Sequence, residues 1–264
     1  MSLELDTRRL KILHEIGVGG LAPLLELTLG AVDDTPPRAA PRRAGGEPAL
    51  AAGVVAPAPA PTAVPVPAPA RGEIQARPTG VDAMDWAALE AAVAGCRACK
   101  LCSGRRNTVF GVGPQKADWM VIGEAPGENE DLQGEPFVGQ AGKLLDNMLR
   151  ALGLNRRESV YIANVLKCRP PGNRNPEPEE VAQCEPFLRR QVELLQPRII
   201  LAMGRFAVQS LLQTTEPIGK LRGRVHQYNG VPVIVTYHPA YLLRNLPDKA
   251  KAWTDLCLAR SVAG

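Results

Sequence analysis

Aromatic residues are scarce in this 264-residue chain, and none lies in the first 80 residues. The three Trp, four Tyr and four Phe all lie between Trp86 and Trp253. Aromatic side chains supply much of the apolar surface that a core buries, so their absence excludes a conventional core before residue 80. We therefore expect one packed domain over residues 81–264.

Long hydrophobic runs are also missing. No apolar stretch approaches the roughly 20 residues that a membrane-spanning helix needs. The first ten residues are too charged for a secretory signal peptide. We therefore expect a cytoplasmic protein. In a reducing compartment, the six cysteines are better interpreted as metal ligands or buried thiols than as disulfides.

The net charge is small, at +4. The first 80 residues contain eight Lys/Arg and eight Asp/Glu, so the whole surplus lies on the predicted domain. A mild positive excess is compatible with DNA as a partner, and equally with an enzyme that acts on neutral substrates.

Two segments precede the predicted domain. Residues 1–30 are predicted to contain a short amphipathic helix. Its apolar residues recur at roughly helical spacing, at Leu3, Leu10, Leu13 and Ile16. The glycines that follow, Gly17, Gly19 and Gly20, are expected to end it. A protein partner is one use for this helix. Residues 31–80 hold an Ala/Pro-rich stretch with eleven of the 25 prolines, which predicts an extended, disordered linker.

The predicted domain alternates short apolar runs with helical patterns. We expect strands at Asp118–Gly123, Ser159–Asn164, Arg198–Met203 and Val231–Tyr237. We expect helices at Met84–Ala94, Gly139–Leu152, Glu179–Leu195, Arg205–Gln213 and from Asp248 to about Val262, with a kink or break at Pro186. This order predicts an α/β fold with a central four-stranded parallel sheet and helices on both faces.

Polar residues follow the ends of these predicted strands. Glu124 follows the first strand, Asn164 ends the second, Gly204 follows the third and His238 follows the fourth. In open parallel sheets, ligands bind beyond the carboxyl ends of the strands. We therefore expect a functional site that contains Glu124, Asn164 and His238.

Each candidate has a functional and a purely structural interpretation. The carboxamide of Asn164 matches the O4 and N3–H edge of uracil and mismatches cytosine, but Asn also caps strand ends through backbone hydrogen bonds. Phe137 can stack on a flipped base or belong to an ordinary core. His238 can donate to uracil O2 and stabilise developing negative charge, or be a hydrogen-bonded core histidine.

Carboxylates crowd the loop after the first strand, where Glu124, Glu128, Glu130 and Asp131 lie close together in sequence. A carboxylate there can position an attacking water or stabilise an oxocarbenium-like sugar. Some of these four carboxylates are expected to be simply solvated.

The cysteines suggest a metal site. Cys96, Cys99, Cys168 and Cys184 combine one close pair with two distant positions, which suits zinc or a [4Fe-4S] cluster, and spacing alone does not choose between them. Cys102 forms a second C-x2-C pair with Cys99, so a ligand set that includes Cys102 is an alternative. Cys257, in the last predicted helix, is expected to be a buried thiol.

Two segments are candidates for DNA contact. After the second strand, Lys167, Arg169 and Arg174 form a basic stretch without an acid, which indicates either a phosphate-binding loop or a solvated one. After the last strand come Leu242, Leu243 and Arg244. These leucines can fill the gap that an extruded base leaves in the stack, or belong to a helix buried on the sheet.

Four motifs resemble the family-4, iron-sulfur uracil-DNA glycosylases over about residues 90–262. They are Gly123-Glu124-Ala125-Pro126-Gly127, Pro136-Phe137-Val138-Gly139-Gln140-Ala141-Gly142, Asn164 with Lys167-Cys168-Arg169-Pro170-Pro171, and His238-Pro239-Ala240-Tyr241-Leu242-Leu243-Arg244-Asn245. The resemblance implies an enzyme that flips uracil out of DNA and hydrolyses its N-glycosidic bond.

The resemblance also implies residue roles. It makes Cys96, Cys99, Cys168 and Cys184 the ligands of a [4Fe-4S] cluster. It places uracil against Phe137 and Asn164, with Gly123 in the same pocket. It puts the active-site histidine at His238 and the first-motif acid at Glu124, with Glu130 a further candidate. The leucines after His238 match the loop that enters the DNA stack.

One departure concerns the wider superfamily. Its classical branch has a water-activating Asp where this chain has Ala125, although family 4 itself has a small residue there, so the general base is left open. Another relative bonds covalently to uracil-DNA through a His-containing loop after the first motif. This chain has no His between Gly127 and Phe137, so we do not expect covalent attachment to DNA.

Rival functions are a glycosylase for another deaminated base and a non-catalytic iron-sulfur DNA-binding module. We expect the protein to be a monomer.

Overall fold

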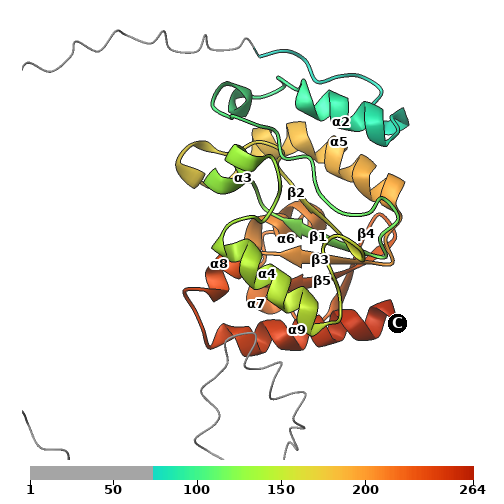
Figure 1. The fold of residues 1–264 in the computed structure, drawn as a ribbon, viewed down its shortest axis with the longest axis vertical. Coiled ribbons are helices and arrows are strands. Elements are labelled where there is room, and N and C mark those ends of the chain that lie inside the picture. The colour runs from blue at the N-terminus through green and yellow to red at the C-terminus, as the bar shows by residue number, and fades with distance from the viewer. Residues whose placement is uncertain (1–73) are drawn as a thin grey trace, which may run out of the picture. The chain divides into compact units, whose positions relative to one another are not determined.

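The computed structural model describes residues 74–264 (Figure 1). The predicted N-terminal helix within 1–30 lies outside the described residues, as does the linker over 31–80 apart from its last seven residues. No helix in the described part is long and apolar enough to cross a membrane.

Five strands form one sheet in the order β2-β1-β3-β5-β4. The parallel strands are β1 (Trp119–Gly123), β2 (Val160–Asn164), β3 (Ile199–Met203) and β5 (Val231–Thr236). Each predicted strand agrees with its observed bounds to within one residue. The prediction of four central parallel strands is confirmed.

A fifth strand, β4 (Val225–Tyr228), was missed by the sequence prediction. It pairs antiparallel with β5 through a tight turn at Asn229 and Gly230, both of which have positive φ. An Asn-Gly pair is a strong hairpin signal. However, β4 lies at the edge of the sheet with alternate residues exposed, so it lacks the continuous apolar run of the buried strands.

The eight described α-helices are named here with their bounds. They are α2 (Trp86–Ala94), α3 (Glu128–Gln133), α4 (Gln140–Ala151), α5 (Pro178–Leu195), α6 (Arg205–Leu212), α7 (Ile218–Leu221), α8 (Pro239–Leu242) and α9 (Asp248–Ala263). All five predicted helices are present. The short helices α3, α7 and α8 were not predicted, because four to six residues are too few to establish a helical period.

Of the predicted kink or break at Pro186, the break is wrong, because α5 continues through this residue. Proline has no N–H to donate to the carbonyl of residue 182, four positions earlier. In the folded chain the guanidinium of Arg77 lies 3.5 Å from the Ala182 carbonyl oxygen and offers it a replacement donor.

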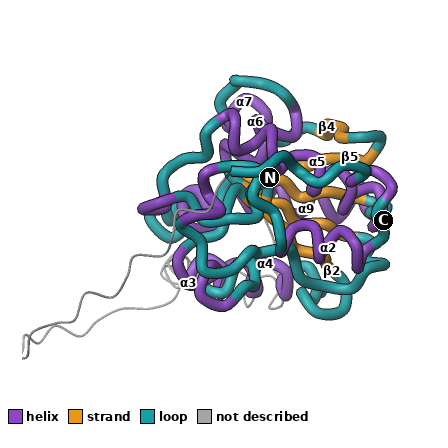
Figure 2. The backbone as a smooth tube through the Cα atoms, turned by 90° about the horizontal axis from the view of Figure 1, so that it is seen from above, coloured by secondary structure: helices purple, strands orange, loops and turns teal. Residues whose placement is uncertain are grey.

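Two apolar layers enclose the sheet. Trp119 and Val121 of β1 pack with α4 and α9, whereas their neighbours Met120 and Ile122 pack with α5 and α6. This alternation follows from the two-residue period of a strand. Figure 1 shows α4 and α9 on one side of the sheet and α5 on the other, and Figure 2 shows the strands from above among the helices and loops. The carboxyl ends of the parallel strands are thereby left open for a site.

Candidate active site

A cavity of about 830 Å³ lies at the carboxyl ends of the parallel strands. Its lining includes Glu124 after β1, Asn164 at the end of β2, Gly204 after β3 and His238 after β5. Residues far apart in the sequence thus meet in one place, because parallel strands bring their carboxyl ends to the same edge.

Phe137 and Asn164 form one buried wall of the cavity. They are 5% and 2% exposed, and both press against Gly123. A Cβ on Gly123 would lie 2.4 Å from Asn164 Oδ1 and 2.6 Å from Phe137 Cζ, so only glycine allows this approach.

Phe137 adopts a backbone conformation that is unusual for a bulky residue, with φ at 55°. Its carbonyl oxygen accepts a hydrogen bond from Arg156 Nη2 at 2.8 Å. The same carbonyl leaves no room for a Cβ on Gly142. These two residues hold the ring at the cavity in spite of the strain.

Asn164 contributes a polar atom with an unsatisfied hydrogen-bonding capacity. Its Oδ1 is buried and has no hydrogen-bond partner among the described residues. Buried polar groups in folded proteins are nearly always bonded, so an exception in a cavity wall calls for an explanation. A ligand that donates a hydrogen bond to Asn164 provides one.

His238 is held as a neutral hydrogen-bond donor. Its Nδ1 accepts the backbone N–H of Ala240 at 3.1 Å, which leaves the proton on Nε2. Burial lowers the pKa of His238 to about 4, although Glu130 opposes that shift. The ring stacks on Phe137 with centroids 5.4 Å apart, and Gly204, with φ at 90°, makes room beside its Cβ.

Glu124 is half-buried at the cavity, and its carboxyl is the one most suited to accept a proton near neutral pH. Burial raises the pKa of Glu124 to about 7, and the positive charge of Arg205 opposes the increase. A carboxyl with this pKa is present in substantial amounts as the basic form at pH 7.

Glu130 also lines the cavity, but its carboxylate is engaged with the backbone. Oε2 accepts the N–H of Gly127 at 3.1 Å. Oε1 accepts those of Val138 at 3.0 Å and Gly139 at 3.3 Å. Glu130 therefore ties the loop after β1 to the loop that carries Phe137.

The cysteines gather at a separate, small pocket. It is lined by Cys96, Cys99, Cys102, Cys168 and Cys184, together with other residues. Burial raises the pKa of Cys168 to about 11 and that of Cys184 to about 12, with further increases from neighbouring cysteines. Among the described residues, no three Cys, His or acidic side chains are placed to hold a single metal ion.

Cys257 is not part of this pocket. It lies in α9 and is exposed, so the prediction of a buried thiol is wrong. The sequence could not show which side of α9 faces the sheet, because the apolar residues of this helix are only weakly segregated to one face.

Comparison with known families identifies the superfamily of this chain. A model of the uracil DNA glycosylase superfamily matches residues 110–258, which include every residue of the cavity lining. The chain belongs to the uracil DNA glycosylase superfamily.

Within the superfamily, the chain is more similar to type-4 than to type-5 relatives. It is 50% identical to a type-4 uracil-DNA glycosylase from Archaeoglobus fulgidus over 156 residues, 56% of this chain and 78% of the relative. It is 42% identical to the type-4 enzyme of Pyrobaculum aerophilum over 66% of this chain and 93% of the relative. A type-5 uracil-DNA glycosylase of that organism is 34% identical over 49% of this chain and 64% of the relative. The predicted family-4 resemblance is confirmed.

One residue predicted to contact DNA is placed elsewhere by this superfamily fold. Lys167 is 1% exposed, and its ammonium donates to the carbonyls of Phe110 at 3.3 Å and Asn164 at 2.8 Å and to Gln191 Oε1 at 2.6 Å. All three of its donors are used, so the prediction that Lys167 binds phosphate is wrong. Instead, it supports the end of β2 from behind the cavity.

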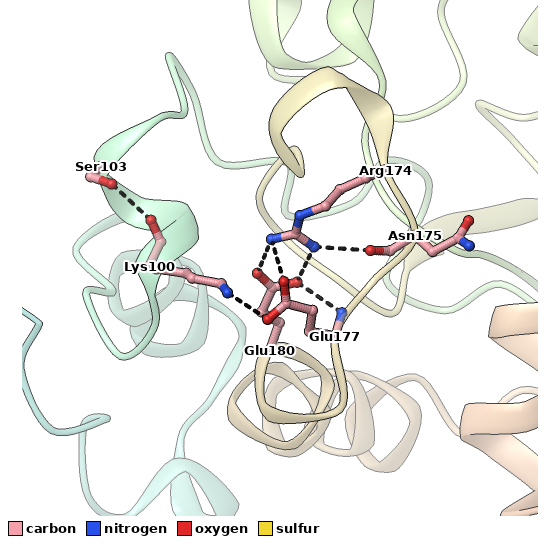
Figure 3. Close-up of polar contacts among 6 residues, drawn as sticks. All are labelled: Lys100, Ser103, Arg174, Asn175, Glu177 and Glu180. Atoms are coloured by element: carbon pink, nitrogen blue, oxygen red, sulfur yellow. Dashed lines mark hydrogen bonds and ion pairs between the residues drawn. The ribbon is translucent and has the colours of Figure 1, made fainter.

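Arg174 and Arg169 are half-buried and have acidic partners that lie outside the predicted basic stretch. The guanidinium of Arg174 pairs with the buried carboxylate of Glu180, with Nη1 at 2.9 Å from Oε2, and lies 3.3 Å from Glu177 (Figure 3). Arg169 bonds Asn173 Oδ1 at 2.7 Å and lies 3.5 Å from Glu128. The predicted acid-free basic loop is therefore neutralised by acids from α5 and α3.

The two leucines after His238 have different environments. Leu242 is 1% exposed and packs in the core against α4 and α9, so it cannot enter a DNA stack as predicted. Leu243 is 42% exposed, and the next residue, Arg244, is exposed and lines the cavity. The interpretation that a leucine fills the gap left by an extruded base therefore applies only to Leu243.

Several residues of the cavity lining were not singled out from the sequence, four of them close to strand ends. Arg205 and Phe206 follow the end of β3, and Tyr237 and Tyr241 flank His238. The signal for these four residues was their position, because each lies within five residues of a strand's carboxyl end, where a site was expected. Only chemically reactive or amide side chains were considered there.

Proposed function

We propose that this protein is a uracil-DNA glycosylase that hydrolyses the N-glycosidic bond of a uracil extruded from DNA and leaves an abasic site for base excision repair. The observation that carries the proposal is the buried, unpartnered Oδ1 of Asn164 in a cavity beside Phe137 and His238. Membership of the superfamily and the names of the type-4 relatives support it.

Asn164 and Phe137 provide recognition of the base. The carboxamide oxygen of Asn164 accepts uracil N3–H, and its NH2 donates to O4. Cytosine presents an acceptor at N3 and a donor at N4, so both contacts become repulsive. The ring of Phe137 offers the flat apolar surface on which an extruded base stacks.

His238 and Glu124 supply the chemistry. As the N1–C1′ bond breaks, its electron pair moves onto uracil, and the Nε2–H of neutral His238 donates to O2, where negative charge develops. Water attacks the electron-poor C1′, and Glu124 accepts its proton. The products are the uracil anion, which takes a proton from solvent, and an abasic sugar.

Glu130 acts as a positioning residue in this scheme. Its carboxylate accepts hydrogen bonds from three backbone N–H groups, which fix it between the two loops. By joining the Glu124 loop to the Phe137 loop, it sets the distance between the residue that accepts the proton and the ring that holds the base.

Cys96, Cys99, Cys168 and Cys184 are proposed to hold a [4Fe-4S] cluster. Several buried thiols that raise each other's pKa are unfavourable as thiolates without a cation, and a cluster supplies that charge. The resemblance to the family-4 enzymes, and not the spacing of the cysteines, is the reason for proposing a cluster over zinc. When bound, the cluster cross-links the segment before β1 to the loop after β2 and to α5.

Activity on defined oligonucleotides tests the proposal. Single- and double-stranded DNA with one uracil is incubated with anaerobically purified protein, and alkali-labile abasic sites are measured. Wild type is expected to cleave, with His238→Ala and Asn164→Asp reduced about 100-fold or more.

The rival functions predict different results. Release of hypoxanthine but not uracil indicates a glycosylase for another deaminated base. Binding without release of any base, from protein with full iron content, indicates a non-catalytic DNA-binding module. A cytoplasmic location, a monomeric state and a partner for the N-terminal helix stay predictions.

A further inference from the structure

Arg205 and Phe206 form a stacked pair on the wall of the cavity. They are the first two residues of α6, directly after Gly204 at the end of β3. The guanidinium carbon of Arg205 lies 4.4 Å from the centre of the Phe206 ring. Arg205 is exposed, Phe206 is half-buried, and both side chains line the cavity.

The charge of Arg205 is available to an anion. Three arginines line the cavity: Arg174, Arg205 and Arg244. Arg174 is neutralised by Glu180. Within residues 74–264, neither Arg205 nor Arg244 makes an ion pair or a side-chain hydrogen bond.

On the basis of the proposed function, we infer that Arg205, oriented by Phe206, binds a DNA phosphate adjacent to the extruded deoxyuridine. That nucleotide carries one phosphate on each side of its sugar. With the base against Phe137 and Asn164, both phosphates have to lie toward the open rim of the cavity. Two unpaired arginines on the lining, Arg205 and Arg244, match two phosphates.

Phe206 is a positioning residue in this contact. An arginine side chain loses considerable rotational freedom when it binds a phosphate. Stacking on an aromatic ring restricts the guanidinium beforehand and leaves its N–H edge free to donate. Phe206 therefore reduces the entropy that Arg205 loses on binding DNA.

The test is the salt dependence of DNA binding. Dissociation constants are measured between about 50 and 200 mM salt with an oligonucleotide carrying 2′-deoxypseudouridine, whose carbon–carbon glycosidic bond cannot be hydrolysed. Arg205→Ala is expected to weaken binding about tenfold. It should also reduce the slope of log affinity against log salt by about 0.7 on single strands or 0.9 on duplex.

Three further variants separate charge from stacking. Arg205→Lys should keep the slope, because the charge remains. Phe206→Leu should also keep the slope but weaken binding about two- to fivefold, because the guanidinium loses its aromatic support. Arg150→Ala is the matched control, since it removes an exposed arginine at the far end of α4 and should change neither quantity.

An unchanged slope in Arg205→Ala would overturn the inference. If that variant instead shifts the pH dependence of turnover at unchanged slope, Arg205 acts on Glu124 and not on DNA. If Phe206→Leu binds like wild type, the positioning role fails. Wild-type turnover of uracil-DNA is measured in parallel, so failure of the proposed function is scored separately from failure of the phosphate contact.

Discussion

Gly123 lies so close to Asn164 that a single added carbon would collide with it. A Cβ on Gly123 would be 2.4 Å from Asn164 Oδ1, well inside the contact distance of the two atoms. The first motif of the chain is therefore in direct contact with the residue that we propose recognises the base. The proposed pocket depends on both strand ends at once.

Gly123→Ala should lower kcat/KM on uracil-DNA by about 100-fold, because displacement of a substrate-positioning group by about 1 Å has effects of that size. Overpacking should also cost about 1–3 kcal/mol of stability. Both are measured by steady-state kinetics and thermal unfolding. Gly104→Ala is the control, since its Cβ would meet nothing within 4 Å. Wild-type kinetics in Gly123→Ala would show that Asn164 and Phe137 can move without consequence.

The pH dependence of kcat/KM should show an ascending limb near pH 7. Burial raises the pKa of Glu124 to about 7, and this carboxyl must lose its proton to act as a base. Activity is therefore low below that pH and reaches a plateau above it. Because burial lowers the pKa of His238 to about 4, its ring stays neutral between about pH 5 and 8 and adds no limb there.

Glu124→Gln should lose most of the activity and, in what remains, the limb near pH 7. Persistence of that limb in Glu124→Gln would mean that another group accepts the proton. The rate is measured over the same pH range for both proteins, with folding checked at each end of the range.

Folding stability should depend on His238 in the acid range. The pKa of His238 is lower in the folded state than its ordinary value of 6.5, so the unfolded chain binds more protons between pH 6.5 and about 4. The free energy of unfolding should therefore fall as the pH falls through that window. His238→Gln should flatten this part of the curve in urea titrations at several pH values. An equally steep decline in the variant would assign it to other groups.

Glu130→Ala should raise KM and lower stability by about 1–2 kcal/mol, because three backbone N–H groups lose their acceptor. The limb near pH 7 should stay where it is in wild type, since Glu130 is not the base. Kinetics over the pH range and thermal unfolding together decide the matter. Loss of the limb in Glu130→Ala would return Glu130 to the list of catalytic candidates.

Iron content should distinguish the cluster ligands from the other cysteines. Cys184→Ala should lose iron and visible absorbance, whereas Cys102→Ala should keep both, although Cys102 lines the same pocket. Cys257→Ala is the control, because Cys257 is exposed on α9. Loss of iron in Cys102→Ala with retention in one of the four proposed ligands would establish the ligand set that includes Cys102.

The sequence by itself determined the parallel strands and the meeting of Glu124, Asn164 and His238. Buried strands are continuous apolar runs, and the residues after them must lie at one edge of a parallel sheet, so local pattern and chain direction suffice.

Only the tertiary structure decided which cations and leucines are available to DNA. Lys167 and Leu242 look exposed in sequence but face inward, and Arg174 gains its partner Glu180 from the following helix. Burial and charge pairing depend on which elements pack together, and a local count of charges does not include acids that arrive from other elements. For that reason the sequence led to Lys167 as a phosphate contact although its side chain is buried.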